Sequence, residues 1–224
     1  TNLRIVLIAL FGLVVGQAVV WYTGQFYALF FLTQVLKVDA QAANLMVAGA
    51  LLLGTPFFIV MGALSDRIGR KPVILAGCAL AALTYFPIFR GLTHFANPAL
   101  EAAQAAAPVK VIADPAECSF QFNPVGTSKF TSSCDIAKAA LVRAGVPYTN
   151  ETAPAGTVAR VDVGGTAIPA YRGSAGDAKA LGTAFDGALV GALKAAGYPA
   201  TADPSRINTP MVVALLFVLV FYVT

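Results

Sequence analysis

Charged side chains are scarce in this chain of 224 residues, which has 15 Lys and Arg, 11 Asp and Glu, and a charged fraction of 12%. Soluble domains are about 25% charged, so the deficit argues against an ordinary soluble domain and predicts a membrane protein. The net charge of +4 does not indicate a nucleic-acid partner, because no basic stripe alternates with aromatic residues. We therefore expect the lipid bilayer, and no nucleic acid, as a partner.

Residue types that carry out catalysis or bind metals are also rare. The chain has one histidine and three cysteines, and it contains no Cys-x-x-Cys motif. No hydrolytic triad and no glycine-rich phosphate loop can be recognised in the sequence. These absences argue against an enzyme, and we expect no metal and no cofactor.

Two of the cysteines, Cys118 and Cys134, flank a polar, turn-rich stretch at 119–133. In an oxidising compartment this spacing predicts a disulfide, which would contribute about 3 kcal/mol in the chain-entropy description of cross-links. Metal or redox chemistry in the cytosol fits less well, because the paired motifs typical of such sites are absent. Cys78 lies within an apolar segment and is expected to remain a free thiol.

Long hydrophobic runs make up most of the remaining sequence. A helical span takes about 20 residues, and four apolar segments reach or approach this length, at 5–36, 42–64, 72–92 and 209–224. We predict three transmembrane helices within 1–97 and the start of a fourth from 209 onward. Because the last segment is short and no signal peptide precedes the first, both ends are expected to be cuts through a longer polypeptide.

The second and third apolar segments are joined by a short basic turn, which predicts a helical hairpin. Three cations and one acid lie within 66–71, so the positive-inside rule places this turn in the cytoplasm. Counting spans from the turn places 94–206 outside, in the periplasm or extracellular space. In the first segment, Gly12, Gly16 and Gly24 are candidates for bends or close helix packing.

The stretch at 98–208 differs in composition from the apolar segments, with frequent Pro, Gly, Ser and Thr and charges every few residues. It predicts a small α+β domain inserted between all-α transmembrane helices. The expected strands lie at 109–112, 119–122, 158–163 and 167–171, and the last two form a hairpin. The expected helices are 135–144, closed by Gly145, and a second one opened by a capping box from Ser174 to Asp177 and ended at Gly197.

The basic turn has a recognisable pattern. Gly62 to Lys71 reads G-x-L-x-D-R-x-G-R-K and resembles the loop signature of the major facilitator superfamily of transporters. The stretches 16–27 and 84–89 are similar to the metabolite:proton symporter branch. The resemblance covers 1–97 and 207–224 and implies a partial major facilitator fold, with helices seven to nine, the start of helix ten, and the missing half of the same transporter as a partner. The long insert departs from the family pattern, in which this outer loop is short.

By similarity to the family, the turn is a gate that closes the cytoplasmic side while the outer side is open. Asp66 is expected to pair with Arg70 one helical turn later, and two glycines would allow close helix approach. The alternative is that the charges only set the topology. The gate residues are Gly62, Asp66, Arg67, Gly69, Arg70 and Lys71.

A polar stripe crosses the middle of the first apolar segment. Gln17, Trp21 and Gln25 follow one another at a spacing of four, with Tyr22 adjacent, at a depth beyond the interfacial aromatic belt. Polar side chains at this depth face either a cavity or another helix, so lining a substrate cavity and bonding between helices both remain open. Arg90, near the outer end of the third segment, could attract an organic anion or extend toward the headgroups.

The resemblance implies secondary active transport by rocking about a central site in a bacterial inner membrane. A small organic acid or zwitterionic metabolite is the expected substrate and a proton the expected coupled ion. None of the predicted spans contains Asp or Glu in its apolar interior, so a coupling carboxylate would lie in the missing part. The alternative is a membrane-anchored extracytoplasmic module that binds or senses a ligand, which the ordered, disulfide-linked insert motivates.

Overall fold

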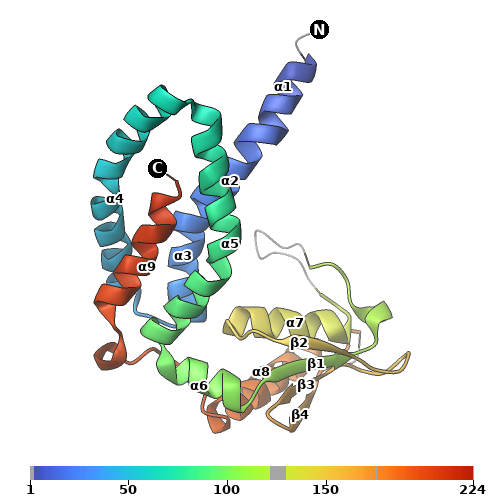
Figure 1. Ribbon diagram of the computed structural model, residues 1–224. Coiled ribbons are helices and arrows are strands. Elements are labelled where there is room, and N and C mark those ends of the chain that lie inside the picture. The colour runs from blue at the N-terminus through green and yellow to red at the C-terminus, as the bar shows by residue number, and fades with distance from the viewer. Residues whose placement is uncertain (1–2, 122–129, 175, 224) are drawn as a thin grey trace. The chain divides into compact units, whose positions relative to one another are not determined.

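The computed structural model describes residues 3–121, 130–174 and 176–223. The chain divides into two compact units: a membrane unit of residues 1–98 and 201–224, and an inserted unit of residues 99–200. Helices make up the membrane unit, whereas the four-stranded sheet belongs to the inserted unit (Figure 1). Residues 201–208 belong to the membrane unit, because the N–H of Ala202 donates to the Lys37 carbonyl and the N–H of Asn208 to the Phe95 carbonyl, both at 2.9 Å.

Three helices of the membrane unit are long and apolar enough to cross a membrane, as the sequence predicts. The first runs from Leu3 to Val35, the second is α4 (Ala40–Ile68) and the third is α5 (Arg70–Ala96). A shorter apolar helix, α9 (Thr209–Phe221), follows the inserted unit and the 3-10 turn η5 (Pro204–Arg206). The first helix alternates α-helical and π-helical turns, namely α1 (Leu3–Ala9), η1 (Leu10–Val14), α2 (Val15–Tyr22), η2 (Thr23–Tyr27), α3 (Ala28–Phe30) and η3 (Phe31–Val35).

The predicted helical hairpin is present, and a single residue makes its turn. Gly69 follows α4 and precedes α5, with φ +95° and ψ 147°, a backbone conformation that side chains with a Cβ rarely adopt. Its N–H donates to the Ser65 carbonyl at 2.9 Å, which satisfies one of the last carbonyls of α4. A Cβ at Gly62 would meet no described atom within 4 Å, so the close helix approach expected there stays a prediction.

α9 packs closely against the other three helices of the membrane unit, and glycine makes this possible. A Cβ at Gly24 would lie 2.9 Å from the backbone carbonyl oxygen of Leu219, closer than real Cβ contacts. At three further glycines, an added Cβ would lie 2.6–3.0 Å from an atom of α9 or of the residue that follows it. They are Gly54 on α4, facing Val220, and Gly77 and Gly91 on α5, facing Tyr222 and Leu215.

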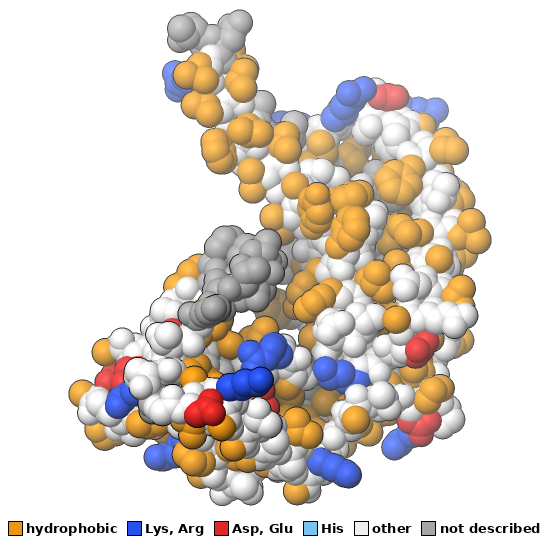
Figure 2. Space-filling model, turned by 180° about the vertical axis from the view of Figure 1, so that it is seen from behind, with side chains coloured by type: hydrophobic (Ala, Val, Ile, Leu, Met, Phe, Trp, Pro, Cys, Tyr) orange, Lys and Arg blue, Asp and Glu red, His pale blue; other side chains and the backbone are white. Residues whose placement is uncertain are grey.

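The outer surfaces of these helices are apolar. Figure 2 shows hydrophobic side chains spread over the membrane unit, and Lys and Arg gathered with an acidic residue at the α4–α5 turn. Leu52, Ile59 and Leu83 are each at least 75% exposed, which would be costly in water and is suited to lipid. We conclude that this unit associates with a membrane.

The inserted unit is a two-layer α+β domain with a mixed sheet. Its elements are α6 (Pro98–Ala106), β1 (Val109–Ala113), η4 (Pro115–Glu117), α7 (Ser133–Ala144), β2 (Thr149–Thr152), β3 (Arg160–Val163), β4 (Thr166–Pro169) and α8 (Ala178–Ala195). The strand order is β2-β1-β3-β4, with β1 parallel to β2 and antiparallel to β3. One sheet face is buried, and α7 and α8 are bridged by an ion pair of 3.5 Å between Arg143 and Asp186.

Most of the predicted elements of the inserted unit are confirmed. β1, the β3–β4 hairpin and α7 occur where expected, and Gly145 closes α7 with φ +66°. The predicted disulfide joins Cys118 to Cys134. In α8, Phe185, Leu189 and Leu193 are buried at a spacing of four, whereas Leu181 one turn earlier is 38% exposed.

Two local predictions are wrong. Residues 119–121 are irregular, because the Asp135 carboxylate accepts hydrogen bonds from the Ser119 N–H and hydroxyl at 2.9 and 2.7 Å; position 122 lies outside the described residues. The capping box from Ser174 is not used, because Asp177 itself caps α8 by accepting from the N–H groups of Lys179 and Ala180. The sequence also did not predict β2, whose four residues are all exposed.

Candidate functional site

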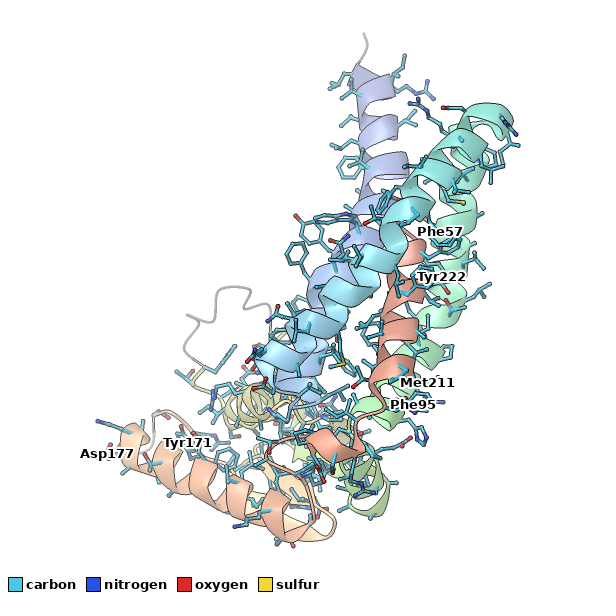
Figure 3. All side chains as sticks on the ribbon, turned by 90° about the vertical axis from the view of Figure 1, so that its left-hand side faces the viewer. Phe57, Phe95, Tyr171, Asp177, Met211 and Tyr222 are labelled. Carbon is cyan, nitrogen blue, oxygen red and sulfur yellow. A yellow bond between two sulfur atoms is a disulfide. The ribbon has the colours of Figure 1, made fainter. Side chains whose placement is uncertain are left out.

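A cluster of polar and aromatic side chains lies inside the membrane unit, where α2, α5 and the end of α9 meet. Trp21, Tyr85 and Tyr222 pack around a small buried core formed by Val20, Ala81 and Val223. Figure 3 labels Tyr222 at the C-terminal end of α9. The polar cluster is defined here as Gln17, Trp21, Thr84, Tyr85 and Tyr222.

Hydrogen bonds within the polar cluster run between helices. The hydroxyls of Thr84 and Tyr222 are hydrogen-bonded at 2.7 Å, and the Tyr85 hydroxyl donates to the Val20 carbonyl at 3.2 Å. The Gln17 side-chain amide donates to the Val223 carbonyl at 3.4 Å. These groups therefore tie α2, α5 and α9 together at a depth where an unpaired polar group would be costly.

Two cavities adjoin the polar cluster. The first has a volume of about 360 Å³ and is lined by Gln17, Trp21 and Tyr22 together with apolar residues of the first helix and Ile74. The second has about 340 Å³ and lies between α4, α5 and Tyr222, next to the α4–α5 turn. Both are within the size range of about 300–1,000 Å³ that is typical of sites for small molecules.

The structure brings together some of the residues of the predicted stripe. Gln17, Trp21 and Tyr22 line the first cavity, and Gln17 also donates to the carbonyl of Val223, just after α9; that a substrate occupies the cavity stays a prediction. Gln25 does not line this cavity, because the π-helical turn η2 begins at Thr23 and interrupts the spacing of four. Arg90 is exposed on α5 and lines neither cavity.

Three members of the polar cluster were not predicted as site residues. Thr84 and Tyr85 are polar residues in the middle of the third apolar segment. Polar residues at this depth usually face a cavity or another helix, so their position could have identified them. Tyr222 could not be placed from the sequence, because its partner Thr84 is separated from it by 138 positions.

The α4–α5 turn carries an exposed ion pair. The Arg70 guanidinium lies 3.8 Å from the Asp66 carboxylate, and the two side chains are 83% and 71% exposed. Such a pair contributes little to the stability of this chain, because solvent screens it. Arg67 and Lys71 are exposed beside it, so the whole charged turn is available to another surface.

In the inserted unit, three carboxylates hold the loops around the start of α7. Glu117 accepts hydrogen bonds from Arg172 and from the buried Ser133 hydroxyl, and Asp114 accepts from the N–H groups of Gly156 and Ala116. The Arg172 and Ser133 hydrogen bonds lower the pKa of Glu117, and the two backbone N–H groups lower that of Asp114. Burial alone would raise the pKa of Asp135, but hydrogen bonds from Ser119 and its neighbours outweigh burial and lower it.

These lowered pKa values predict that the inserted unit loses stability in acid. The ordinary values are 3.8 for Asp and 4.5 for Glu, so the carboxylate bonds stabilise the fold fully above about pH 4.5. Below that pH the carboxyl groups of the unfolded chain take up protons first. The stabilisation is then lost as the pH falls through the lower pKa values that these groups have in the folded state. Hydrogen exchange of peptides from 99–200 at pH 7 and pH 3 would measure this loss. Glu117→Gln should weaken the pH dependence, whereas equal protection at both pH values would contradict the prediction.

Aromatic and apolar side chains line the two cavities, and the polar groups beside them bond to neighbouring segments of the same unit. The charged turn and the polar cluster both belong to the membrane unit. Comparisons of the chain with protein-family models, with curated proteins and with solved structures found no match.

Proposed function

We propose that this chain is part of a secondary active transporter of the major facilitator type, which moves a small organic acid or zwitterionic metabolite together with protons. The observation that carries the proposal is the polar cluster beside a cavity, in which the Thr84 and Tyr222 hydroxyls bond to each other and the Gln17 and Tyr85 side chains donate to backbone carbonyls of neighbouring segments. A purely structural anchor has no need of such groups, because apolar residues would fill the same depth at lower cost.

The lining of the first cavity favours this substrate class. Trp21 and Tyr22 present aromatic faces, which attract a cationic ammonium group. The Gln17 side chain also lines this cavity, and a substrate carboxylate would accept from its amide in place of the Val223 carbonyl, which accepts from it at 3.4 Å. A molecule carrying both groups would use both kinds of contact.

The proposed orientation places the α4–α5 turn in the cytoplasm of a bacterium and residues 94–206 in the periplasm or outside the cell. Arg4 at the start of the first helix is on the same side by parity, and the disulfide of the inserted unit is typical of an oxidising compartment. In this orientation the exposed Asp66–Arg70 pair is available to latch the cytoplasmic side against another part of the transporter. The latch must open in each cycle, which suits a weak, solvent-exposed ion pair.

The proposal is tested by uptake into proteoliposomes that contain the full-length polypeptide, under an imposed pH gradient. Radiolabelled carboxylates and betaines are the probes, and accumulation that collapses on addition of a protonophore is the expected result. Quenching of tryptophan fluorescence by a transported compound, lost in Trp21→Phe, would report occupancy of the first cavity. Absence of both uptake and quenching for every carboxylate and betaine would refute the proposal.

Asp66→Asn is expected to lower the initial uptake rate about tenfold, because the latch loses its charge and the coupling between gate and central site is typically of this size. Transport is measured at equal protein content in the proteoliposomes. Asp39→Asn is the matched control: Asp39 caps α4 at its other end, and asparagine caps a helix equally well. If both variants transported as well as the parent, Asp66 would have no gating role.

The alternative function is a membrane-anchored module that binds a ligand through the inserted unit. One observation favours it: the inserted unit has its own buried core and two cavities of about 160 and 200 Å³. Deleting 105–200 from the full-length protein separates the two functions. Retained uptake would make the inserted unit accessory to transport, whereas ligand binding that disappears without any transport in either form would support the module.

A further inference from the structure

The Cys118–Cys134 disulfide lies at the carboxyl end of the central strand β1. β1 ends at Ala113, and its neighbours β2 and β3 lie on opposite sides of it. Cys118 follows β1 and η4, and Cys134 is the second residue of α7, the helix that connects β1 to β2. The disulfide therefore joins the segment that leaves β1 to the first turn of the helix that leads the chain to β2.

The two sulfurs have unequal surroundings. Cys134 is fully buried in the first turn of α7, where the positive end of the helix stabilises a thiolate. Cys118 is partly exposed, and its Sγ lies 3.4 Å from the carbonyl oxygen of Asp114. An incoming thiol can thus reach one sulfur, while the other is placed to accept negative charge.

A cavity beside the partly exposed Cys118 is lined by one cationic and one acidic side chain. Its volume is about 200 Å³, and its lining includes Cys118, Lys138 and Glu151. Lys138 is on α7, one helical turn after Cys134. A nearby ammonium group favours the thiolate forms that thiol exchange requires.

The carboxylates that face this region are held by other groups. Glu117 is bonded to Arg172 and Ser133, Asp135 accepts from Ser119, and Glu151 pairs with Lys110 at 3.4 Å. Their negative charges are therefore partly compensated, which limits their repulsion of a thiolate in the cavity.

We propose that Cys118 and Cys134 form a thiol–disulfide exchange site on the inserted unit, which takes thiols as its substrate class. The thiolate of a substrate attacks Sγ of Cys118, a new S–S bond forms, and the bond to Cys134 breaks with Cys134 leaving as a thiolate. A second thiol of the substrate then attacks the mixed disulfide, and Cys118 leaves in turn. In sum, a substrate dithiol loses two electrons and two protons and becomes a disulfide, and the Cys118–Cys134 disulfide gains them and becomes a dithiol.

The sequence alone argued against redox chemistry, because exchange sites are recognised by Cys-x-x-Cys and these cysteines are 16 positions apart. In the fold the two cysteines are neighbours, because Cys118 follows the end of β1 and Cys134 lies in the first turn of α7, with their Cα atoms 5.2 Å apart. The site is on a different unit from the polar cluster, so it can be present whether or not the chain takes part in transport.

The site is tested on the full chain in lipid nanodiscs, with Cys78→Ala to remove the free thiol and leave the Cys118–Cys134 disulfide. Reduced glutathione is the probe, and adducts are located by mass spectrometry after rapid alkylation. The expected result is glutathione on Cys118 while the inserted unit remains folded by circular dichroism. No adduct on the folded protein, or an adduct on Cys134, would overturn the assignment and leave the bond as a structural cross-link.

Single-cysteine variants measure the asymmetry between the two sulfurs. Cys134→Ser leaves Cys118 free, and Cys118→Ser leaves Cys134 free; with oxidised glutathione the first should react at least about tenfold faster, because only its thiol is accessible. Equal rates in the two folded variants would contradict the proposal.

Lys138→Gln tests the role of the cation without touching either sulfur. We expect glutathione exchange to slow roughly threefold to tenfold, since the thiolates in the cavity lose a favourable charge. Lys194→Gln, at the end of α8 in the same unit, is the matched control and should leave the rate unchanged. If the two substitutions had the same effect, Lys138 would not assist the exchange.

Discussion

Gly24→Val is expected to displace α9 from the membrane unit and to lower its free energy of unfolding by about 3 kcal/mol, the upper end of the cost of overpacking a core. A Cβ at position 24 would lie 2.9 Å from the carbonyl oxygen and 3.3 Å from the carbonyl carbon of Leu219. Both are backbone atoms of a helix, so they cannot move aside as the end of a flexible side chain can. Thermal unfolding in detergent, followed by circular dichroism, measures the loss.

Gly12→Val is the matched control for this prediction. Gly12 is in the same apolar helix, and a Cβ there would meet no described atom within 4 Å. The two variants share the loss of glycine and the gain of a β-branched residue, so the difference between their unfolding temperatures reports the contact with α9. Equal unfolding temperatures for Gly12→Val and Gly24→Val would show that the close approach does not stabilise the unit.

Much of the membrane unit could be predicted from the sequence, because lipid imposes a strong and local constraint. Each span must satisfy its backbone internally and present apolar side chains, so apolar run length alone located the three long helices. The exact helix ends depended on single residues outside these runs. Asp39 begins α4, and Gly69 both ends α4 and allows the turn to α5.

The polar cluster could be predicted only in part. Gln17 and Trp21 were found because they follow one another at helical spacing within one segment. The spacing failed at Gln25, because π-helical turns are set by packing against neighbouring helices rather than by a local pattern. Tyr222 joins the cluster through a contact with α5 that no local rule contains.

In the inserted unit, polar residues account for two errors in predicting strands from the sequence. β2 reads Thr-Asn-Glu-Thr, with no alternation of apolar and polar residues, and it is a strand because it pairs with β1 as an exposed edge. The expected strand from Ser119 failed for the opposite reason, since side chains of α7 bond its backbone instead of another strand. Here tertiary hydrogen bonds decided the outcome.

One of these tertiary contacts has the largest expected effect in the inserted unit. The hydroxyl of Ser133 is fully buried, donates to the Glu117 carboxylate at 2.8 Å and accepts from the Ala159 N–H at 2.9 Å. Ser133→Ala removes both bonds and leaves the buried N–H of Ala159 without this acceptor. A buried polar group left unpaired costs about 1–3 kcal/mol, and the lost bond to a charged group adds to this, so we expect a loss of about 3 kcal/mol.

Hydrogen exchange of the full chain in nanodiscs places this loss within the inserted unit. Peptides that span 157–163 should exchange on the order of a hundredfold faster in Ser133→Ala, because a loss of about 3 kcal/mol changes an opening equilibrium by roughly that factor. Ser119→Ala is the matched control: its hydroxyl also bonds a carboxylate, that of Asp135 at 2.7 Å, but the residue is exposed and water can replace it. The control should therefore change protection only slightly. If it lowered protection as much as Ser133→Ala, burial of the hydroxyl would not be what holds α7, η4 and β3 together.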